Sequence, residues 1–234
     1  MSKNMSFKDF IKDKRVCFVG GCPNMKGLGY GDIIDGYDVV VKTNGSLFLG
    51  GDDYFIDYGQ RIDVLYTNNQ FYREMSPLPL SAMKSKGIKH LRMKTCSNQD
   101  LLEFNKYFHA EKISVAIDKV NQVVHGALMG AYIYTDILEC EPKELFIVGI
   151  DFFISKRKEF KKNVYREYLE NYLPEKIRKQ GNKINVGKKE DGHSVFDNTK
   201  YIYDLWGKHE NMVFPDFIEE IMHGIIRRDL EQKN

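Results

Sequence analysis

A histidine in a Gly-His-Ser turn is the side chain of this 234-residue sequence best suited to moving a proton. His193 has an unperturbed pKa of about 6.5, near neutral pH, so it can take a proton from a hydroxyl and release it again. Gly192 lets the backbone turn, and Ser194 can cap a following helix or bond a phosphate. A lone histidine is more often structural, so the residue types alone leave both interpretations open.

A glycine-rich segment follows the first strongly apolar stretch, "RVCFVGG". It opens with Gly20 and Gly21 and continues with glycines at 27, 29 and 31. Glycines in a turn after a strand let backbone N–H groups approach a phosphate or a sugar. The segment has neither GxGxxG nor GK[ST], so it is not a dinucleotide fingerprint or a P-loop. Ligand binding and ordinary turns both remain open.

Asparagines end the next two apolar stretches. Asn44 closes "YDVVVKTN", Asn68 follows Thr67 in "RIDVLYTNN", and Asn24 lies in the first glycine-rich turn. An asparagine amide can donate and accept a hydrogen bond at once, which suits the edge of a base or a ribose. These side chains are therefore candidate ligand contacts.

The stretch from residue 156 to 189 is basic, with twelve Lys or Arg residues against four Glu. It also carries Tyr165, Tyr168 and Tyr172. Two interpretations are open: a solvated helical insertion, or a basic lid over an anionic ligand.

Apolar stretches predict strands that alternate with helical patterns. The expected strands cover residues 15–21, 37–44, 61–69, 87–94, 112–117 and 143–152, and the expected helices 99–108 (with Asn98 as its cap), 126–140 and 215–230. This alternation predicts an α/β fold with a doubly wound, mainly parallel sheet. Ligands of such sheets bind beyond the carboxyl ends of the strands, where the Gly and Asn clusters fall.

The composition narrows the function classes. The 35 basic and 33 acidic side chains give no global argument for a nucleic-acid partner. The N-terminal residues lack the apolar core of a signal peptide, and no stretch approaches the roughly 18 apolar residues of a membrane span. Peripheral contact with a membrane stays open. The four cysteines show no zinc spacing. We expect a cytoplasmic chain with reduced thiols, in one domain (1–234) with an insertion at 154–190.

The glycine-rich segment resembles the long donor-binding motif of the sialyltransferase superfamily. The matching positions are Gly20, Asn24-Met25, Gly27, Gly29-Tyr30-Gly31, Ile34-Asp35, Asp38-Val39 and Asn44, continued by Gly59, Arg61 and Asp63. Residues 123–153 resemble the shorter donor motif, where His125 and Gly126 would face a ligand at the start of a helix. The ending "KELFIVGIDFF" is closer to bacterial lipooligosaccharide sialyltransferases, and "GHS" resembles their element before a helix.

The resemblance implies a Rossmann-like, GT-A-like sheet and an inverting glycosyltransferase. This enzyme would transfer sialic acid from CMP-sialic acid to a glycan hydroxyl, with His193 as the general base and without a metal or other cofactor. The implied partners are the nucleotide sugar and a glycan acceptor, and no nucleic acid. The implied donor-binding residues are Gly20, Gly21, Asn24, Asn44, Thr67, Asn68, His125, Gly126, Tyr165 and Ser194.

The sequence departs from the family pattern at four positions. Gly21 stands where the family has Asn, His125 where it has Ser or Thr, and Phe153 where bacterial members have a phosphate-binding Tyr. Asn198 replaces the Glu of the Golgi H-x-x-x-x-E pattern. These departures keep two alternatives open: another CMP-sugar donor such as CMP-Kdo, or an inactive CMP-binding protein. A nucleic-acid module built on the basic insertion is a further alternative, against which the net charge of +2 argues.

Golgi relatives join their two donor motifs by a disulfide. Cys17 and Cys140 lie near those places, but each is displaced from the family register. A one-residue shift along a strand turns a side chain to the other face. We therefore predict free thiols.

Overall fold

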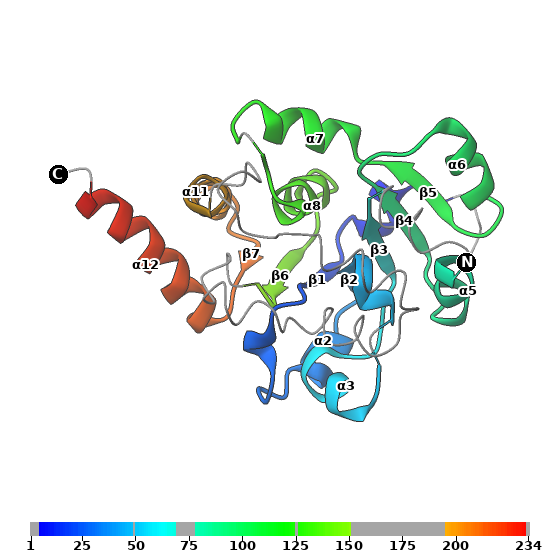
Figure 1. Cartoon of the computed structure of the whole chain (residues 1–234), viewed down its shortest axis with the longest axis horizontal. Helices are drawn as coiled ribbons and strands as arrows, with labels where there is room; N and C mark the ends of the chain where they lie inside the picture. The colour runs from blue at the N-terminus through cyan, green and yellow to red at the C-terminus, as the bar shows by residue number, and fades with distance from the viewer. Residues whose placement is uncertain (1–4, 49, 69–77, 125, 151–194, 233–234) are drawn as a thin grey trace, which may run out of the picture.

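The computed structural model describes residues 5–48, 50–68, 78–124, 126–150 and 195–232. Its centre is a seven-stranded sheet with the order β5-β4-β3-β2-β1-β6-β7, in which all neighbouring strands are parallel (Figure 1). The strands are β1 Arg15–Val19, β2 Val39–Thr43, β3 Val64–Thr67, β4 His90–Met93, β5 His109–Lys112, β6 Glu144–Val148 and β7 Met212–Val213. The prediction of a doubly wound parallel sheet is confirmed.

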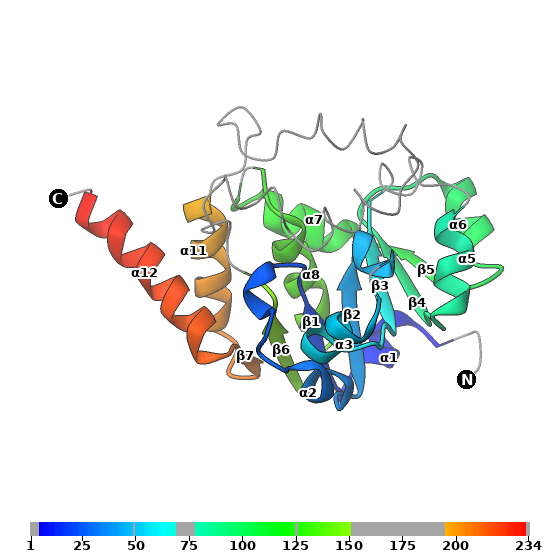
Figure 2. The same cartoon turned by 60° about the horizontal axis from the view of Figure 1, so that its bottom comes forward.

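Helices cover both faces of the sheet (Figures 1 and 2). The core on one face contains side chains from α1 Phe7–Ile11, α7 Ser114–Asn121, α8 Met129–Leu138, α11 Val195–Trp206 and α12 Asp216–Gln232. The opposite face is covered by α2 Gly31–Asp35, α3 Asp52–Tyr58, α5 Leu78–Ser85 and α6 Asn98–Phe104. The 3-10 turns η1 Pro23–Met25 and η2 Asn44–Phe48 follow β1 and β2. The central strands are mostly apolar because both of their faces are buried.

Two local predictions were wrong. The stretch 112–117 is not a strand, because β5 ends at Lys112 and α7 begins at Ser114. Ile113, Ala116 and Val120 are buried while Val115 is 57% exposed, which is the period of a helix. Asn98 does not cap α6: Ser97 accepts a hydrogen bond from the Asp100 N–H and completes a capping box with that side chain.

A buried ion network fixes α8 against the sheet. The Arg92 guanidinium on β4 donates two hydrogen bonds to Asp136 of α8, over 3.0 and 2.7 Å. The Tyr66 hydroxyl donates to the same carboxylate over 2.7 Å. Because these groups are shielded from water, the pairing holds α8 in one position over β3 and β4.

No helix in the described part of the chain is long and apolar enough to cross a membrane. Cys17, Cys22, Cys96 and Cys140 are free thiols in the structure. The predicted insertion at 154–190 lies outside the described residues.

Candidate functional site

The order of the strands reverses between β1 and β6, and the region beyond the carboxyl ends of these strands and of β2 and β3 is the candidate ligand crevice. The chain builds the sheet outward from β1 to β5 and then returns to place β6 on the other side of β1. At such a reversal, the loops after the two central strands leave in opposite directions, and the space beyond their carboxyl ends is where doubly wound folds bind ligands. The first motif of the sequence begins at this point, directly after β1.

Two glycines bring the loops of the crevice together. A Cβ atom on Gly20 would lie 2.2 Å from the carbonyl oxygen of Gly149, and one on Gly149 would lie 2.5 Å from the Gly20 oxygen. Gly149 also has a φ of 69°, which side chains disfavour. The Cys22 N–H donates to the Gly149 oxygen over 2.9 Å. The loops after β1 and β6 therefore meet backbone to backbone.

The strand register places most of the described candidates along this edge. Val19 pairs with both Lys42 and Val148, and Thr43 pairs with Tyr66. The next residues along these strands therefore lie at one level of the sheet, beyond the carboxyl ends. They are Gly20, Gly21, Asn44, Thr67 and Asn68. The Thr67 hydroxyl, which is fully buried, donates to the Asn68 carbonyl over 3.3 Å.

Asn24 joins the two loops and still has hydrogen-bonding capacity. It lies in η1, and its amide nitrogen donates to the Ile150 carbonyl over 2.9 Å. Its Oδ1 atom is buried and has no hydrogen-bond partner among the described residues. Because an unpaired buried acceptor is costly, such an atom is expected where a ligand supplies the missing donor.

Asn44 repeats this pattern at the end of β2. Its Oδ1 atom is also buried without a partner in the described part of the chain. Its backbone has a φ of 38°, a left-handed conformation that asparagine tolerates better than most residues. The residue type is therefore suited both to the turn and to accepting a hydrogen bond from a ligand.

The glycines at 27, 29 and 31 have structural roles in the loop and its neighbouring helices. The Gly27 and Gly29 amides donate to the buried Asp57 carboxylate over 2.7 and 2.9 Å. Gly31 begins α2, where a Cβ atom would lie 2.0 Å from the Phe55 oxygen of α3. For Gly27 and Gly29 the turn interpretation was therefore right, because their N–H groups already have an acceptor. Asp57, which sequence reasoning missed, holds this loop in place.

The end of the long motif is a scaffold as well. The Asp35 carboxylate accepts the backbone N–H groups of Gln60 and Arg61 over 2.9 and 3.0 Å. The Arg61 guanidinium donates to the carbonyls of Asp35 and Tyr37 and to the Asp63 carboxylate. These residues join α2 to β3 and do not face the crevice edge.

Lys42 is a buried charged residue that sequence reasoning also missed. It is 1% exposed, and its ammonium group donates to the Gly59 carbonyl over 2.7 Å. The pKa of Lys42 is lowered to about 7, mainly by burial; Asp35 opposes this shift and Lys86 adds to it. A lysine inside the otherwise apolar "VVVKT" was the available signal. Its ammonium group lies against Gly59 and Tyr54, on the side of the sheet that α3 covers.

The starts of α8 and α11 are joined at the same edge. A helix that leads into a parallel strand begins at the carboxyl edge of the sheet, which applies to α8 before β6 and to α11 before β7. The Leu128 N–H donates to the Oδ1 atom of Asn198 over 2.8 Å. Gly126, with a φ of 66°, turns the chain toward this contact.

Four predicted site residues lie outside the described residues: His125, Tyr165, His193 and Ser194. Phe153 lies outside them as well. The structure does confirm that a helix begins at Val195, directly after the Gly-His-Ser sequence.

Comparisons with solved structures identify the fold. The chain is similar to the sialyltransferase CstII from Campylobacter jejuni in complex with cytidine-5'-monophosphate, with a TM-score of 0.58 at 12% identity, covering 87% of this chain and 80% of that one. It is similar to the Campylobacter jejuni alpha-2,3-sialyltransferase in apo form, with a TM-score of 0.55 at 16% identity, covering 92% of this chain and 79% of that one. It is also similar to a mammalian sialyltransferase, with a TM-score of 0.52 at 15% identity, covering 87% of this chain and 69% of that one.

No protein-family model and no curated protein matches the sequence. The fold is thus that of the sialyltransferase structures, as the sequence motifs predicted.

Proposed function

We propose that this chain is a glycosyltransferase that transfers sialic acid from CMP-sialic acid to a hydroxyl of a glycan. The observation that carries the proposal is the pair of unpaired, buried Asn24 and Asn44 oxygens at the crevice of a sialyltransferase fold. CstII, which has this fold, has been solved with CMP and with a trisaccharide acceptor and CMP.

Nucleotide binding would use these two asparagine oxygens. The exocyclic amine of cytosine and the ribose hydroxyls are donors, and each could supply the hydrogen bond that Asn24 and Asn44 lack. The space beside Gly20 is taken by the Gly149 backbone, so Gly20 would shape the loop while Gly21 would lie against the nucleotide. Thr67 and Asn68 close the same edge on β3.

The chemistry would be a single displacement. The bond between the anomeric carbon and the phosphate oxygen breaks, and CMP leaves with the electron pair. The acceptor oxygen bonds to the opposite side of the anomeric carbon, which inverts its configuration, and His193 takes the hydroxyl proton. The start of α11 at the carboxyl edge, two residues after His193, supports this role. The Leu128–Asn198 hydrogen bond joins the start of α8 to α11, so His125 and Gly126, just before α8, would lie beside the donor.

Stabilisation of the leaving phosphate is assigned to side chains rather than to a metal. Tyr165, Ser194 and the basic insertion are the proposed donors, because CMP leaves with one phosphate and preorganised hydrogen bonds can carry its charge. We therefore propose that transfer is metal-independent. The cytoplasmic location inferred from the sequence remains a prediction.

The test is CMP release from CMP-sialic acid and from CMP-Kdo, with and without galactose-terminated oligosaccharides, in the presence and absence of EDTA. We expect acceptor-stimulated release from CMP-sialic acid that survives chelation. Faster CMP release from CMP-Kdo than from CMP-sialic acid would identify CMP-Kdo as the donor instead. CMP binding without release from either donor would establish an inactive CMP-binding protein. Strong, salt-dependent binding to random oligonucleotides without CMP binding would favour the nucleic-acid module.

A further inference from the structure

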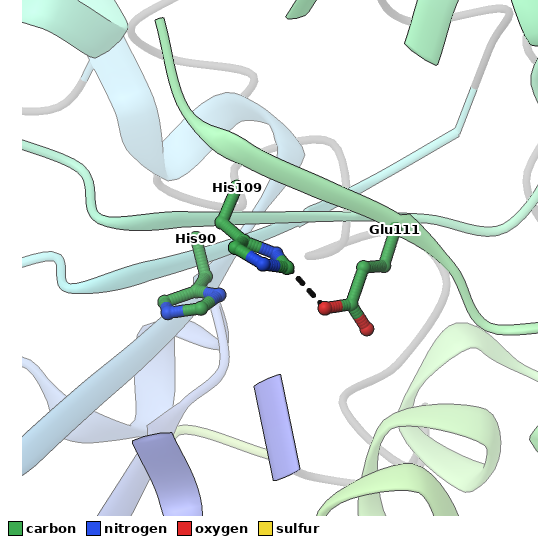
Figure 3. A group of neighbouring side chains, drawn as sticks. All are labelled: His90, His109 and Glu111. Carbon is green, nitrogen blue, oxygen red and sulfur yellow. Dashed lines mark ion pairs between the residues drawn. The ribbon is translucent and has the colours of Figure 1, made fainter. Parts of the chain in front are cut away.

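Three potential metal ligands meet at the amino ends of β4 and β5. His90 is the first residue of β4 and His109 the first of β5, and the two residues pair across the strands. Glu111 is two residues further along β5, so it lies on the same side of the sheet as His109. Figure 3 shows the two rings and the carboxylate on the same side of these strands.

The three side chains are close enough to share one ion. Each contributes a ligand atom, and these atoms all lie within 4.8 Å of one another. The Nδ1 atom of His109 is 2.9 Å from Oε1 of Glu111, and the two imidazole centroids are 4.9 Å apart. Tetrahedral zinc with bonds of about 2.0–2.1 Å separates its ligand atoms by about 3.3 Å. Small rotations of the side chains would bring the three ligand atoms to these separations.

A second observation points to a ligand at this place. The Nδ1 atom of His90 is buried and has no hydrogen-bond partner among the described residues, whereas Nδ1 of His109 has only the Glu111 carboxylate beside it. His90 is only 3% exposed, with its ring packed between Phe10 and His109. A buried imidazole nitrogen without a partner needs an explanation, and a bound metal ion supplies one.

We propose that His90, His109 and Glu111 form a binding site for Zn²⁺. Two imidazole nitrogens and one carboxylate oxygen are ligands that zinc accepts, with water in the fourth position. His109 and Glu111 keep side-chain exposures of 25% and 32%, so solvent and ions can reach the site.

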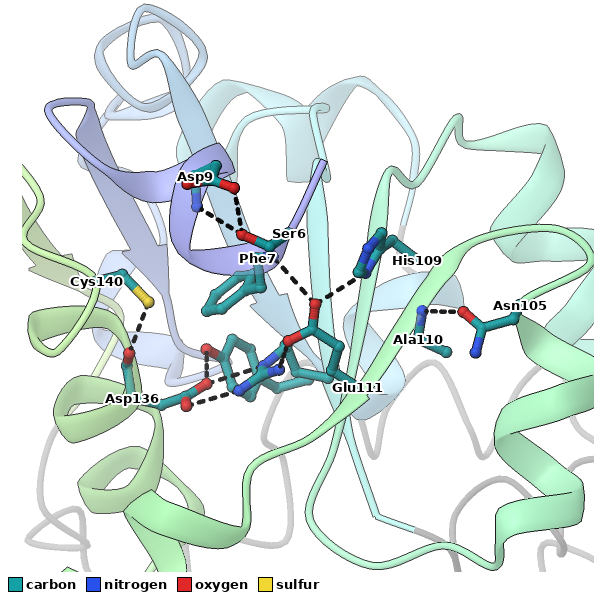
Figure 4. Close-up of polar contacts among 11 residues, drawn as sticks. Ser6, Phe7, Asp9, Asn105, His109, Ala110, Glu111, Asp136 and Cys140 are labelled. Atoms are coloured by element: carbon teal, nitrogen blue, oxygen red, sulfur yellow. Dashed lines mark hydrogen bonds and ion pairs between the residues drawn. The ribbon is translucent and has the colours of Figure 1, made fainter. Parts of the chain in front are cut away.

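Glu111 can bind the ion and keep its contacts with Phe7 and Arg92, while the ion would replace its direct contact with His109. Its Oε1 atom accepts the Phe7 N–H over 3.1 Å, and its Oε2 atom accepts from Arg92 over 2.5 Å (Figure 4). A carboxylate has about four lone-pair positions, so two remain for other partners. The positive charge of Arg92 is balanced by its ion pair with Asp136. Such supporting contacts orient a ligand and strengthen its metal bond.

The site is separate from the proposed donor crevice. His90 and His109 begin their strands, whereas the crevice lies beyond the carboxyl ends of β1, β2, β3 and β6. The ion would join β4 and β5 to the start of α1 through the Phe7 contact. We therefore expect it to stabilise the fold and to play no part in sugar transfer.

The experiment is a titration of the full, tag-free, reduced and chelator-treated chain with ZnCl₂, followed by calorimetry and by the melting temperature. We expect one equivalent to bind and to raise the melting temperature. His109→Gln and Glu111→Gln replace partly exposed ligands with uncharged residues of suitable size. Each should weaken zinc binding at least tenfold and abolish the melting shift. The exposed His223→Gln on α12 is the matched control and should behave as wild type.

Zinc binding of equal strength in wild type and in both ligand variants would overturn the proposal, as would no binding to folded wild type. Replacing zinc with Co²⁺ distinguishes cysteine ligation, since a thiolate-to-cobalt charge-transfer band would also contradict it. CMP affinity, measured on the same samples, should be equal in all variants. The zinc site and the proposed function can therefore fail separately.

Discussion

The crevice beyond β1 and β2 and the polar cluster around Asp63 contain residues of the same motif, yet they differ in how their buried groups are paired. Asp63 accepts the Val40 N–H over 2.9 Å and pairs with Arg61 and Lys89 over 2.8 and 2.6 Å. Asn24 and Asn44 each leave a buried oxygen unpaired. The motif thus contains two kinds of residue, those that complete the fold and those whose partners are missing.

The unpaired atoms fall in only two places. Among the residues described, the buried side-chain atoms without a partner are the two asparagine oxygens in the crevice and Nδ1 of His90 in the histidine pair, where Nδ1 of His109 contacts only Glu111. Leaving a buried polar group unpaired typically costs about 1–3 kcal/mol. We therefore expect unsatisfied hydrogen-bonding groups to distinguish ligand-binding residues from structural residues within the same motif.

The largest expected effect comes from His193→Ala. General-base catalysis contributes about 10²–10⁴-fold, so turnover should fall by that factor while CMP affinity changes little. The ascending limb of the rate against pH should also disappear near neutrality. Steady-state kinetics and calorimetry with CMP check both statements. A purely structural His193 would instead lower the melting temperature and leave the folded fraction active.

Asp63→Ala tests the scaffold side of the comparison. The substitution removes two ion pairs and leaves the Val40 N–H without its acceptor, so the free energy of unfolding should fall by about 2–4 kcal/mol. Partial exposure of Arg61 and Lys89 keeps the effect below that of a fully buried pair. Urea denaturation measures it. Unchanged stability together with weakened CMP binding would place Asp63 in the site instead.

The lowered pKa of Lys42 should make the stability of the protein depend on pH. Between pH 7 and about 10.5 the unfolded chain keeps the proton on this amine, whereas the native chain has lost it, because burial lowers the native pKa to about 7. The unfolded state then binds more protons, so the free energy of unfolding rises with pH, by up to about 1.4 kcal/mol per unit.

Lys42→Met removes this contribution. Urea denaturation at pH 7 and pH 9 should show wild type gaining about 1–3 kcal/mol relative to the variant as the pH rises. An equal difference at both pH values would mean that Lys42 stays protonated in the native chain.

Asn44→Gly tests the crevice with the smallest expected effect. Glycine tolerates the φ of 38°, so the backbone should hold while the hydrogen bond to CMP is lost. The loss of about 0.5–1.5 kcal/mol corresponds to affinity roughly 2–10-fold weaker by calorimetry. Asn211→Ala is the control, because its amide bonds the Pro142 carbonyl at the other edge and should affect only stability. Equal CMP affinity in Asn44→Gly and wild type would remove Asn44 from the site.

Much of the fold followed from the sequence because β1, β2, β3 and β6 are mostly apolar runs followed by glycine or asparagine. β5 was placed wrongly because "KISVAI" has β-branched residues in a helical period, and two-residue β7 is too short to leave a pattern. Asn24 and Asn44 were identified as candidates from residue type and position. Asp57 was not, because its bonds to Gly27 and Gly29 depend on how α3 packs. The His90–His109 pair was missed because it depends on the register of two strands.

The most direct test of the central claim is the crystal structure of the chain with bound CMP. The account predicts that the nucleotide lies beyond the carboxyl ends of β1 and β2. Nucleotide donors should be within hydrogen-bonding distance of the Oδ1 atoms of Asn24 and Asn44, with the phosphate directed toward the start of α11. CMP bound elsewhere, with both asparagine oxygens still unpaired, would contradict it.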